Sequence, residues 1–107
     1  MTLALSDDHR RLVMAILVEH LPPGTGVWVF GSRATGRSRP LSDLDLVIDA
    51  GRQLTLDEAA ILAEAFSDSD LPYKVDLVDW HAVDESFRQL IAAERRELSA
   101  VSEAGQP

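Results

Sequence analysis

The sequence predicts an α/β (α+β) fold in which helices pack against a small mixed β-sheet. Short apolar runs rich in β-branched and aromatic residues alternate with longer segments whose apolar residues follow helical spacing. The 107 residues are enough for a single domain, 1–107, with a modest core. A hydrophobic fraction of 46% with 26% charged residues is typical of a globular chain and not of a disordered one.

The first half of the chain predicts a helix followed by two strands. Ser6 is suited to cap a helix whose apolar residues follow, and Pro22-Pro23-Gly24 ends it because proline cannot continue a helical turn. Val27 to Phe30 is a short apolar run typical of a buried strand. Leu44 to Ile48 predicts a second strand, and we expect some helical turn between the two.

The second half predicts a helix, a strand and a last helix. Thr55 and Glu58 form a capping-box pattern, in which hydroxyl and carboxylate satisfy free amides reciprocally. The apolar surface of the helix that follows is expected to be formed by Leu56, Ala59, Ala60, Ile61, Ala63 and Phe66. A polar loop then precedes a third strand, 73–78. The last helix begins near Asp84 and carries Phe87, Leu90, Ile91 and Leu98 on one stripe. The polar tail 99–107 is expected to be flexible.

Composition argues against several classes of protein. The formal net charge of -8 disfavours non-specific DNA or RNA binding, because an acidic protein repels phosphates. No apolar run approaches the roughly 20 residues that a membrane-spanning helix needs. Asp7 and Asp8 do not fit a secretory signal, and a chain without cysteine has neither disulfides nor thiolate metal sites. We expect a cytoplasmic protein without nucleic-acid or membrane partners.

The segment between Gly31 and Ser42 is positively charged, in contrast to the acidic chain as a whole. This segment contains Arg33, Arg37 and Arg39 and no acidic residue. A basic stretch by itself is usually a solvated loop. This one lies between two candidate motifs, which favours a small polyphosphate ligand over a long nucleic-acid track.

The first of these motifs is Gly31-Ser32, directly after the first predicted strand. Glycine permits a tight turn and close approach of a ligand. If a helical turn follows, its free amides and the Ser32 hydroxyl form an anion site. The signal is weak by itself, because a Gly-Ser pair after a strand is usually only a turn. Neither a P-loop nor a Gly-x-Gly-x-x-Gly motif occurs.

The second motif is Asp43-Leu44-Asp45 at the start of the second predicted strand. Residues two apart share a face, so the carboxylates of Asp43 and Asp45 lie about 7 Å apart along the backbone. Hard cations such as Mg²⁺ relieve their repulsion, and a two-metal site becomes possible. Alternatively, Asp43 is a turn residue and Asp45 lies at a strand edge. The Gly-Ser pair upstream favours the functional interpretation.

A third carboxylate is expected on the third predicted strand, which offers Asp76 and Asp79 on opposite faces. Val75 and Leu77 seat that strand in the core, so Asp76 is the better candidate, and Asp79 suits a turn or cap. The histidines, His9, His20 and His81, lack metal-ligand spacing and are expected to be surface residues. None lies near Ser32 in sequence, which argues against serine-hydrolase chemistry.

These motifs resemble the signature of the DNA polymerase β-like nucleotidyltransferase superfamily. The elements are Gly31-Ser32, ten residues, Asp43-Leu44-Asp45-Leu46, and a later Asp76. More narrowly, the chain resembles the minimal nucleotidyltransferases (MNT) of HEPN/MNT two-gene modules. That resemblance extends over most of the chain and includes Trp28 to Arg33, Ser42 to Leu46, Ser69 to Pro72, Val75 to Trp80 and Phe87-Arg88.

The resemblance implies roles for the motif residues. Asp43, Asp45 and Asp76 form the catalytic triad and bind Mg²⁺, while Gly31 and Ser32 hold the nucleoside triphosphate, which is ATP. The implied reaction is attack of an acceptor hydroxyl on the α-phosphorus, with release of pyrophosphate. The acceptor is a tyrosine of a helical HEPN toxin encoded by the neighbouring gene, so the protein is an antitoxin.

Two alternatives remain open. The protein could neutralise its partner by binding, without turnover, although the three aspartates argue against this. It could instead transfer a nucleotide to a small molecule. Larger relatives carry an additional domain that presents the acceptor, and no such segment follows the last predicted helix. The acceptor is therefore expected to be another protein or a small molecule.

Overall fold

The structure, a computed structural model, describes residues 3–100. The helices in this part of the chain are α1 (Asp7–His20), α2 (Ser32–Thr35), α3 (Leu56–Ser67) and α4 (Glu85–Glu94). The strands are β1 (Gly26–Phe30), β2 (Leu44–Asp49), β3 (Val75–Asp79) and β4 (Arg96–Ala100). The expected order of elements is confirmed up to α4, including the short helix between the first two strands. An unexpected strand follows it.

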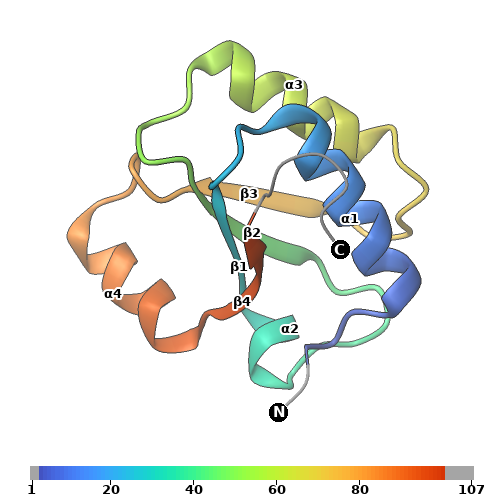
Figure 1. The fold of residues 1–107 in the computed structure, drawn as a ribbon. Coiled ribbons are helices and arrows are strands. Elements are labelled where there is room, and N and C mark those ends of the chain that lie inside the picture. Colours follow the sequence, from blue (N-terminus) through green and yellow to red (C-terminus); the bar gives the residue numbers. More distant parts are fainter. Residues whose placement is uncertain (1–2, 101–107) are drawn as a thin grey trace.

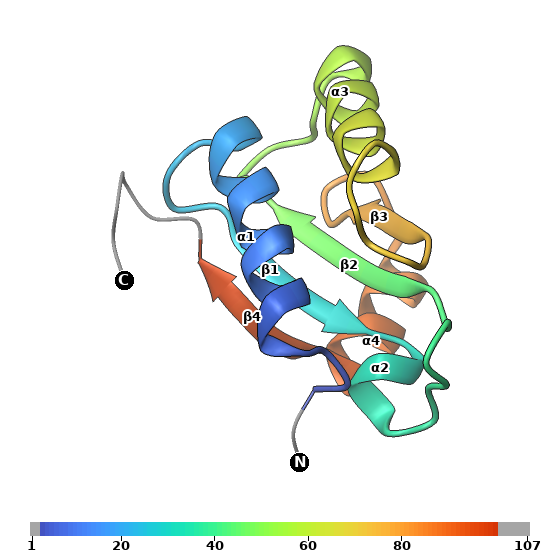
Figure 2. The ribbon, with the colours of Figure 1, turned by 90° about the vertical axis from the view of Figure 1, so that its right-hand side faces the viewer.

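The strands form one mixed sheet in the order β3-β2-β1-β4. β1 pairs antiparallel with β2 and β4, whereas β2 and β3 run parallel, joined by a connection that contains α3. Helices α1 and α3 cover one face of the sheet, and α4 lies on the other, as the two views show (Figure 1, Figure 2). The predicted fold class, helices on a small mixed sheet, is confirmed.

The main hydrophobic core lies between the sheet and the helices α1 and α3. Strand β2 shows how the sequence produces it, because Leu44, Leu46 and Ile48 alternate onto this face and are fully buried. Residues Asp45, Val47 and Asp49 point to the opposite face. The rest of this core comprises Val13, Leu17, Leu21, Val27, Val29, Ala34, Leu62, Phe66, Tyr73 and Leu98.

Local signals in the sequence define the helix ends. The Ser6 hydroxyl accepts a hydrogen bond from the His9 amide, and α1 ends before Pro22 as expected. The Thr55–Glu58 capping box is complete, with both reciprocal hydrogen bonds formed. No helix within residues 3–100 is long and apolar enough to cross a membrane.

The sequence-based prediction was wrong at the end of the chain. Leu98 does not extend the stripe of α4 but is a buried residue of β4. Residues 99 and 100 of the predicted flexible tail also belong to β4, and 101–107 lie outside the described residues. The sequence of β4 has low intrinsic strand propensity, so its conformation depends on pairing with the free edge of β1, whose partner residues are 67 or more positions away.

Two further expectations need correction. In α3, Leu56 and Ile61 are 90% and 54% exposed, and the buried positions are Leu62 and Phe66. Strand β3 starts at Val75 and not at Tyr73. The Tyr73 ring instead packs into the core, and its hydroxyl makes a 2.9 Å hydrogen bond with His9 Nδ1.

Candidate active site

The end of β1 brings the glycine-serine turn beside the aspartate motif. Gly31 adopts a φ of 74°, a conformation that favours glycine. A Cβ atom at this position would overlap Asp45 Oδ2, so any other residue would require the Asp45 carboxylate to move. The antiparallel register pairs Phe30 with Asp45, which explains why the two motifs meet. Ser32 begins α2, whose first backbone amides have no intrahelical acceptors.

The parallel pairing of β2 with β3 brings the carboxylates together. Asp45 pairs with Asp76 in the register, so both side chains point to the α4 side of the sheet. The pKa of Asp45 is raised from 3.8 to about 6. Burial is the largest cause, followed by the negative charges of Asp76 and Asp43, a hydrogen bond with the Asp76 carboxyl, and the charge of Glu94. Asp43, Asp45 and Asp76 therefore form one electrostatically coupled cluster.

Side chains around this cluster have mainly structural partners. Lys74 Nζ lies 3.3 Å from Asp76 Oδ1 in an exposed ion pair. Asp79 has the expected turn role, since its carboxylate accepts hydrogen bonds from the amides of Leu54 and His81 at 2.7 and 2.9 Å. His81 is half-buried, and its Nε2 lies 2.6 Å from Asp49 Oδ1, so it is more than the surface residue that was expected.

The donor set of the cluster suits a hard divalent cation, because Mg²⁺ prefers carboxylate oxygens. The raised pKa of Asp45 supports this fit. A nearby cation would offset both the cost of burying the ionised carboxylate and its repulsion by the neighbouring carboxylates. Within residues 3–100, however, no three His, Cys, Asp or Glu side chains already converge around one point closely enough to hold an ion. The carboxylates would have to draw together, and the exposed Lys74–Asp76 ion pair is weak enough to allow that.

Arg33 does not face a phosphate, which corrects the expectation for the basic segment. Its side chain is only 5% exposed, and its guanidinium donates hydrogen bonds to the carbonyls of Ala4, Pro40 and Ser42 at 2.6 to 3.1 Å. The guanidinium also stacks on the Tyr73 ring at 3.9 Å. Arg33 thus holds the loop that leads into Asp43. The two other arginines of this segment, Arg37 and Arg39, are exposed.

Glu94 is a site residue that the sequence did not indicate. Its carboxylate accepts a hydrogen bond from the Gly31 amide at 3.3 Å and lies 3.8 Å from Arg37 Nη2. It also contributes to the raised pKa of Asp45. Because 63 residues separate Glu94 from Gly31, no local spacing could have revealed the contact.

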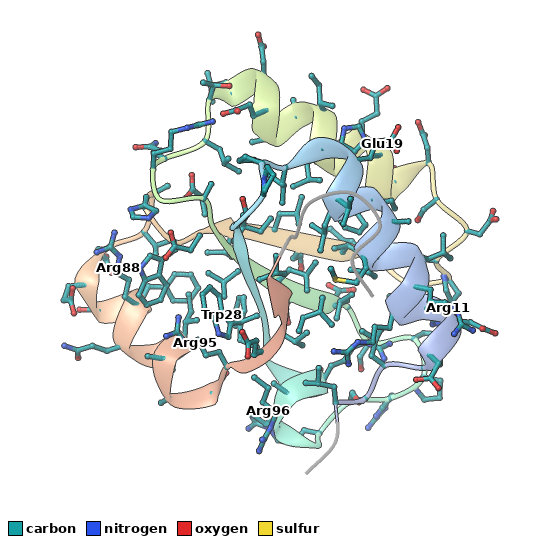
Figure 3. The ribbon with its side chains drawn as sticks, viewed as in Figure 1. Arg11, Glu19, Trp28, Arg88, Arg95 and Arg96 are labelled. Carbon is teal, nitrogen blue, oxygen red and sulfur yellow. The ribbon has the colours of Figure 1, made fainter. Side chains whose placement is uncertain are left out.

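An arginine-tryptophan cluster lies further along the same face of the sheet. The Arg95 guanidinium sits 4.4 Å from the Trp28 ring centroid and 4.9 Å from that of Trp80. Arg88 lies 5.3 Å from Trp80 and donates a hydrogen bond to the Trp80 carbonyl. Figure 3 shows Trp28, Arg88 and Arg95 gathered between α4 and the sheet. This cluster attaches α4 to the strands.

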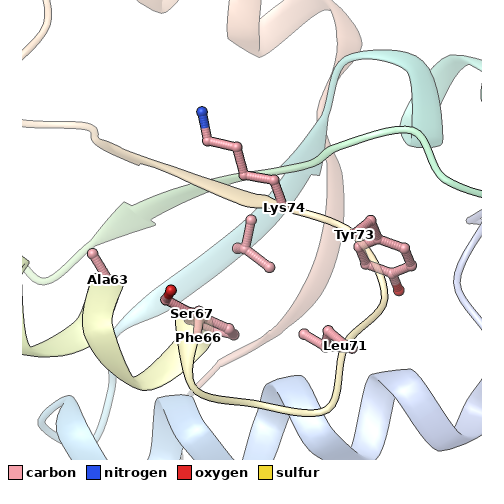
Figure 4. A pocket seen from close by; sticks show the side chains of 7 residues that line it. Ala63, Phe66, Ser67, Leu71, Tyr73 and Lys74 are labelled. Carbon is pink, nitrogen blue, oxygen red and sulfur yellow. The ribbon is translucent and has the colours of Figure 1, made fainter.

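A cavity of about 360 Å³ is lined by none of the three candidate aspartates (Figure 4). It is bordered by α3 and the start of β3, with Val75 among its lining residues. The next residue, Asp76, points to the opposite face because side chains alternate along a strand. The full lining is Ala63, Phe66, Ser67, Leu71, Tyr73, Lys74 and Val75.

Comparison with known proteins agrees with this geometry. Residues 16–103 match the family model described as polymerase beta, nucleotidyltransferase. The chain therefore belongs to the polymerase β nucleotidyltransferase family, and the resemblance noted in the sequence is confirmed. The curated protein "Probable protein adenylyltransferase MntA" of Haemophilus influenzae is 43% identical over 79 residues, which cover 74% of this chain and 69% of the relative.

Two solved structures are similar over most of the chain. One, described as a "putative minimal nucleotidyltransferase", is 30% identical with a TM-score of 0.63, and the match covers 83% of this chain and 88% of the other. A variant of the toxin-antitoxin complex MntA-HpeT is 25% identical with a TM-score of 0.70, covering 83% and 70% of the two chains. These similarities confirm the polymerase β-like nucleotidyltransferase fold.

Proposed function

We propose that this protein is an antitoxin that transfers AMP from ATP to a tyrosine hydroxyl of a partner HEPN toxin. The family is one of nucleotidyltransferases, and the similar Haemophilus influenzae protein is named as a probable protein adenylyltransferase. A similar solved chain belongs to a toxin-antitoxin complex. The observation that carries the proposal is the contact between the two motifs, in which Gly31 lies directly against Asp45.

Each motif residue has a role in this reaction. Gly31 and Ser32 bind the triphosphate through backbone amides and the serine hydroxyl. Asp43, Asp45 and Asp76 would hold Mg²⁺, and three carboxylates could supply ligands for two ions. The chemistry that Mg²⁺ supplies at such carboxylates is neutralisation of phosphate charge and activation of an attacking hydroxyl. We infer that the half-buried Asp45 favours a bound cation. Burial and the neighbouring negative charges make its ionised carboxylate unfavourable when no cation is present.

The transfer balances as a substitution at phosphorus. The tyrosine oxygen forms a bond to the α-phosphorus of ATP, and the bond between that phosphorus and the α,β-bridging oxygen breaks. Pyrophosphate leaves, and the tyrosine proton passes to solvent. The protein contributes position and electrostatics, because the two motifs hold the phosphates beside the carboxylates while the partner presents the hydroxyl.

The test is incubation of the purified protein with α-labelled ATP, Mg²⁺ and the helical protein encoded by the neighbouring gene. Label is expected on a tyrosine of that partner. The variant Asp43→Ala is expected to lose transfer, whereas Asp70→Asn, at an exposed loop position, is expected to retain it. Transfer that survives Asp43→Ala would contradict the proposed site.

A second candidate is neutralisation by binding alone, favoured by the fact that a similar solved chain was crystallised in complex with its toxin. The variant with Asp43, Asp45 and Asp76 all changed to asparagine separates the two functions. If it still protects cells from the toxin, binding alone is sufficient.

A third candidate, transfer to a small molecule, predicts labelled product in cell extract without the neighbouring protein.

A further inference from the structure

Glu94 occupies the groups of the glycine-serine turn that a phosphate would bind. Its Oε1 accepts from the Gly31 amide at 3.3 Å, and its Oε2 lies 3.8 Å from Arg37 Nη2. Both partners are donors that suit an anion, one a backbone amide and the other a guanidinium. The Glu94 side chain is 26% exposed, so the contact is close to solvent and a ligand can reach it.

The chain around Glu94 is held in place at three successive residues. Glu94 is the last residue of α4. Arg95 follows as the C-cap, where its backbone amide donates to the Ile91 carbonyl and its guanidinium lies beside the Trp28 and Trp80 rings. The next residue, Arg96, donates a hydrogen bond to the Ala34 carbonyl of α2 at 3.0 Å. These contacts hold the junction between α4 and β4 against the turn and place the Glu94 carboxylate beside the Gly31 amide.

We propose that Glu94 is an internal competitor for the phosphate-binding turn, which the triphosphate of the nucleotide displaces. This inference rests on the proposed function, since it assumes that Gly31 and Ser32 bind the triphosphate. Two anions cannot share the Gly31 amide, so binding requires the carboxylate to swing away. The Glu94 carboxylate also lies near the Asp45 carboxylate, and its withdrawal lowers the negative potential that an incoming triphosphate meets.

Arg37 changes partner in this exchange. In the structure it is 71% exposed and its Nε donates to the Thr35 hydroxyl at 3.1 Å, which keeps the guanidinium beside the turn. Once Glu94 leaves, Arg37 is free to pair with the β- or γ-phosphate. The same arginine therefore holds the competitor and afterwards the ligand, so the turn always faces an anion. Glu94 sets the concentration of nucleotide at which the site fills.

The test compares two ligands in wild type and Glu94→Gln by isothermal titration calorimetry with Mg²⁺. One ligand is AMP-PNP, which carries three phosphoryl groups, and the other is adenosine, which carries none. For AMP-PNP, Kd is expected to fall about fivefold in Glu94→Gln, as one charged hydrogen bond no longer competes. For adenosine, Kd is expected to stay unchanged. The matched control is Glu85→Gln, an exposed glutamate at the other end of α4.

An AMP-PNP affinity that is unchanged or weaker in Glu94→Gln would overturn the proposal, as would equal tightening for adenosine. Weaker Mg²⁺ binding together with lost transfer would instead identify Glu94 as a metal ligand. If Glu94→Gln does not fold, Glu94→Asp serves, because it withdraws the carboxylate by one methylene and is expected to tighten AMP-PNP to a smaller degree. Failure of the proposed function is distinguishable: wild type would then not label its partner, whatever the Glu94 variants do to AMP-PNP affinity.

Discussion

The two faces of the sheet use the same strands for opposite purposes. On the α1 and α3 side, β2 contributes Leu44, Leu46 and Ile48, all fully buried in a continuous apolar core. On the α4 side, the same strand contributes Asp45, whose pKa is raised to about 6 by burial and by the charges of Asp76 and Asp43. The first face stabilises the fold, while the second gathers like charges that oppose it. The difference indicates that the carboxylates are held for a ligand and not for stability.

The largest expected effect concerns catalysis on the carboxylate face. Asp45→Asn and Asp76→Asn are each expected to reduce AMP transfer on the order of 10³-fold, because each removes a carboxylate that would hold Mg²⁺ beside the phosphates. The measurement is the initial rate with labelled ATP and the partner protein. Asp49→Asn is the matched control, since Asp49 lies on the same strand and face but pairs with His81. Comparable loss in all three variants would mean that the site is not confined to the region of Asp45 and Asp76.

The next effect concerns the apolar face. Leu46→Ala is expected to lower the free energy of unfolding by about 3 kcal/mol, because it removes a fully buried side chain and leaves a cavity. Urea unfolding at pH 7 measures it. Leu56→Ala, at a 90% exposed position, makes the same chemical change and is expected to alter stability by less than about 0.5 kcal/mol. Similar losses for both variants would contradict the placement of the core.

A smaller effect of opposite sign is expected from Asp45→Asn on stability. The folded pKa of about 6 exceeds the ordinary 3.8, so ionisation of Asp45 opposes folding at pH 7 and ceases to do so below pH 4. The variant is therefore expected to gain about 1 kcal/mol at pH 7, a value discounted for solvent screening, and nothing near pH 4. Urea unfolding without divalent cations at the two pH values tests this. Destabilisation at pH 7 would show that Asp45 has a favourable structural partner.

The smallest effect concerns a carboxylate away from the site. The pKa of Glu58 is lowered to about 2, mainly by its hydrogen bonds with the Arg52 guanidinium and then with the Thr55 amide. Its contribution is therefore present above the ordinary pKa of 4.5 and lost as the pH falls toward 2. Glu58→Gln is expected to lower Tm by about 1–2 °C at pH 7, less at high salt. Glu64→Gln, exposed on the same helix, is the control, and an equal decrease there would point to a general charge effect.

The arginines between the two motifs show the limit of what the sequence predicts about individual side chains. Arg33, Arg37 and Arg39 are the same residue type in one stretch between the two motifs, and we expected this basic stretch to favour a polyphosphate ligand. Arg33 is instead buried against carbonyls and the Tyr73 ring. Its partners come from distant parts of the chain, such as Ala4 and Tyr73, so only their assembly decides that this guanidinium serves the fold.

The sequence by itself determined the features that depend on local chemistry and strand periodicity. These were the helix caps at Ser6 and Thr55, the alternation of β2, and the placement of Asp76, and not Asp79, beside Asp45. Because side chains alternate along a strand, the sequence alone predicts which face of the sheet each strand residue occupies.

Only the tertiary structure decided the features that depend on pairing across long distances. Strand β4 exists because the edge of β1 was available, and Glu94 reaches Gly31 because α4 ends there. Neither has a local signal, since a weakly strand-forming segment and a single glutamate acquire their roles from neighbours more than 60 residues away. The meeting of Asp45 with Asp76 was thus predictable from the sequence, whereas the contact of Glu94 with the Gly31 amide was not.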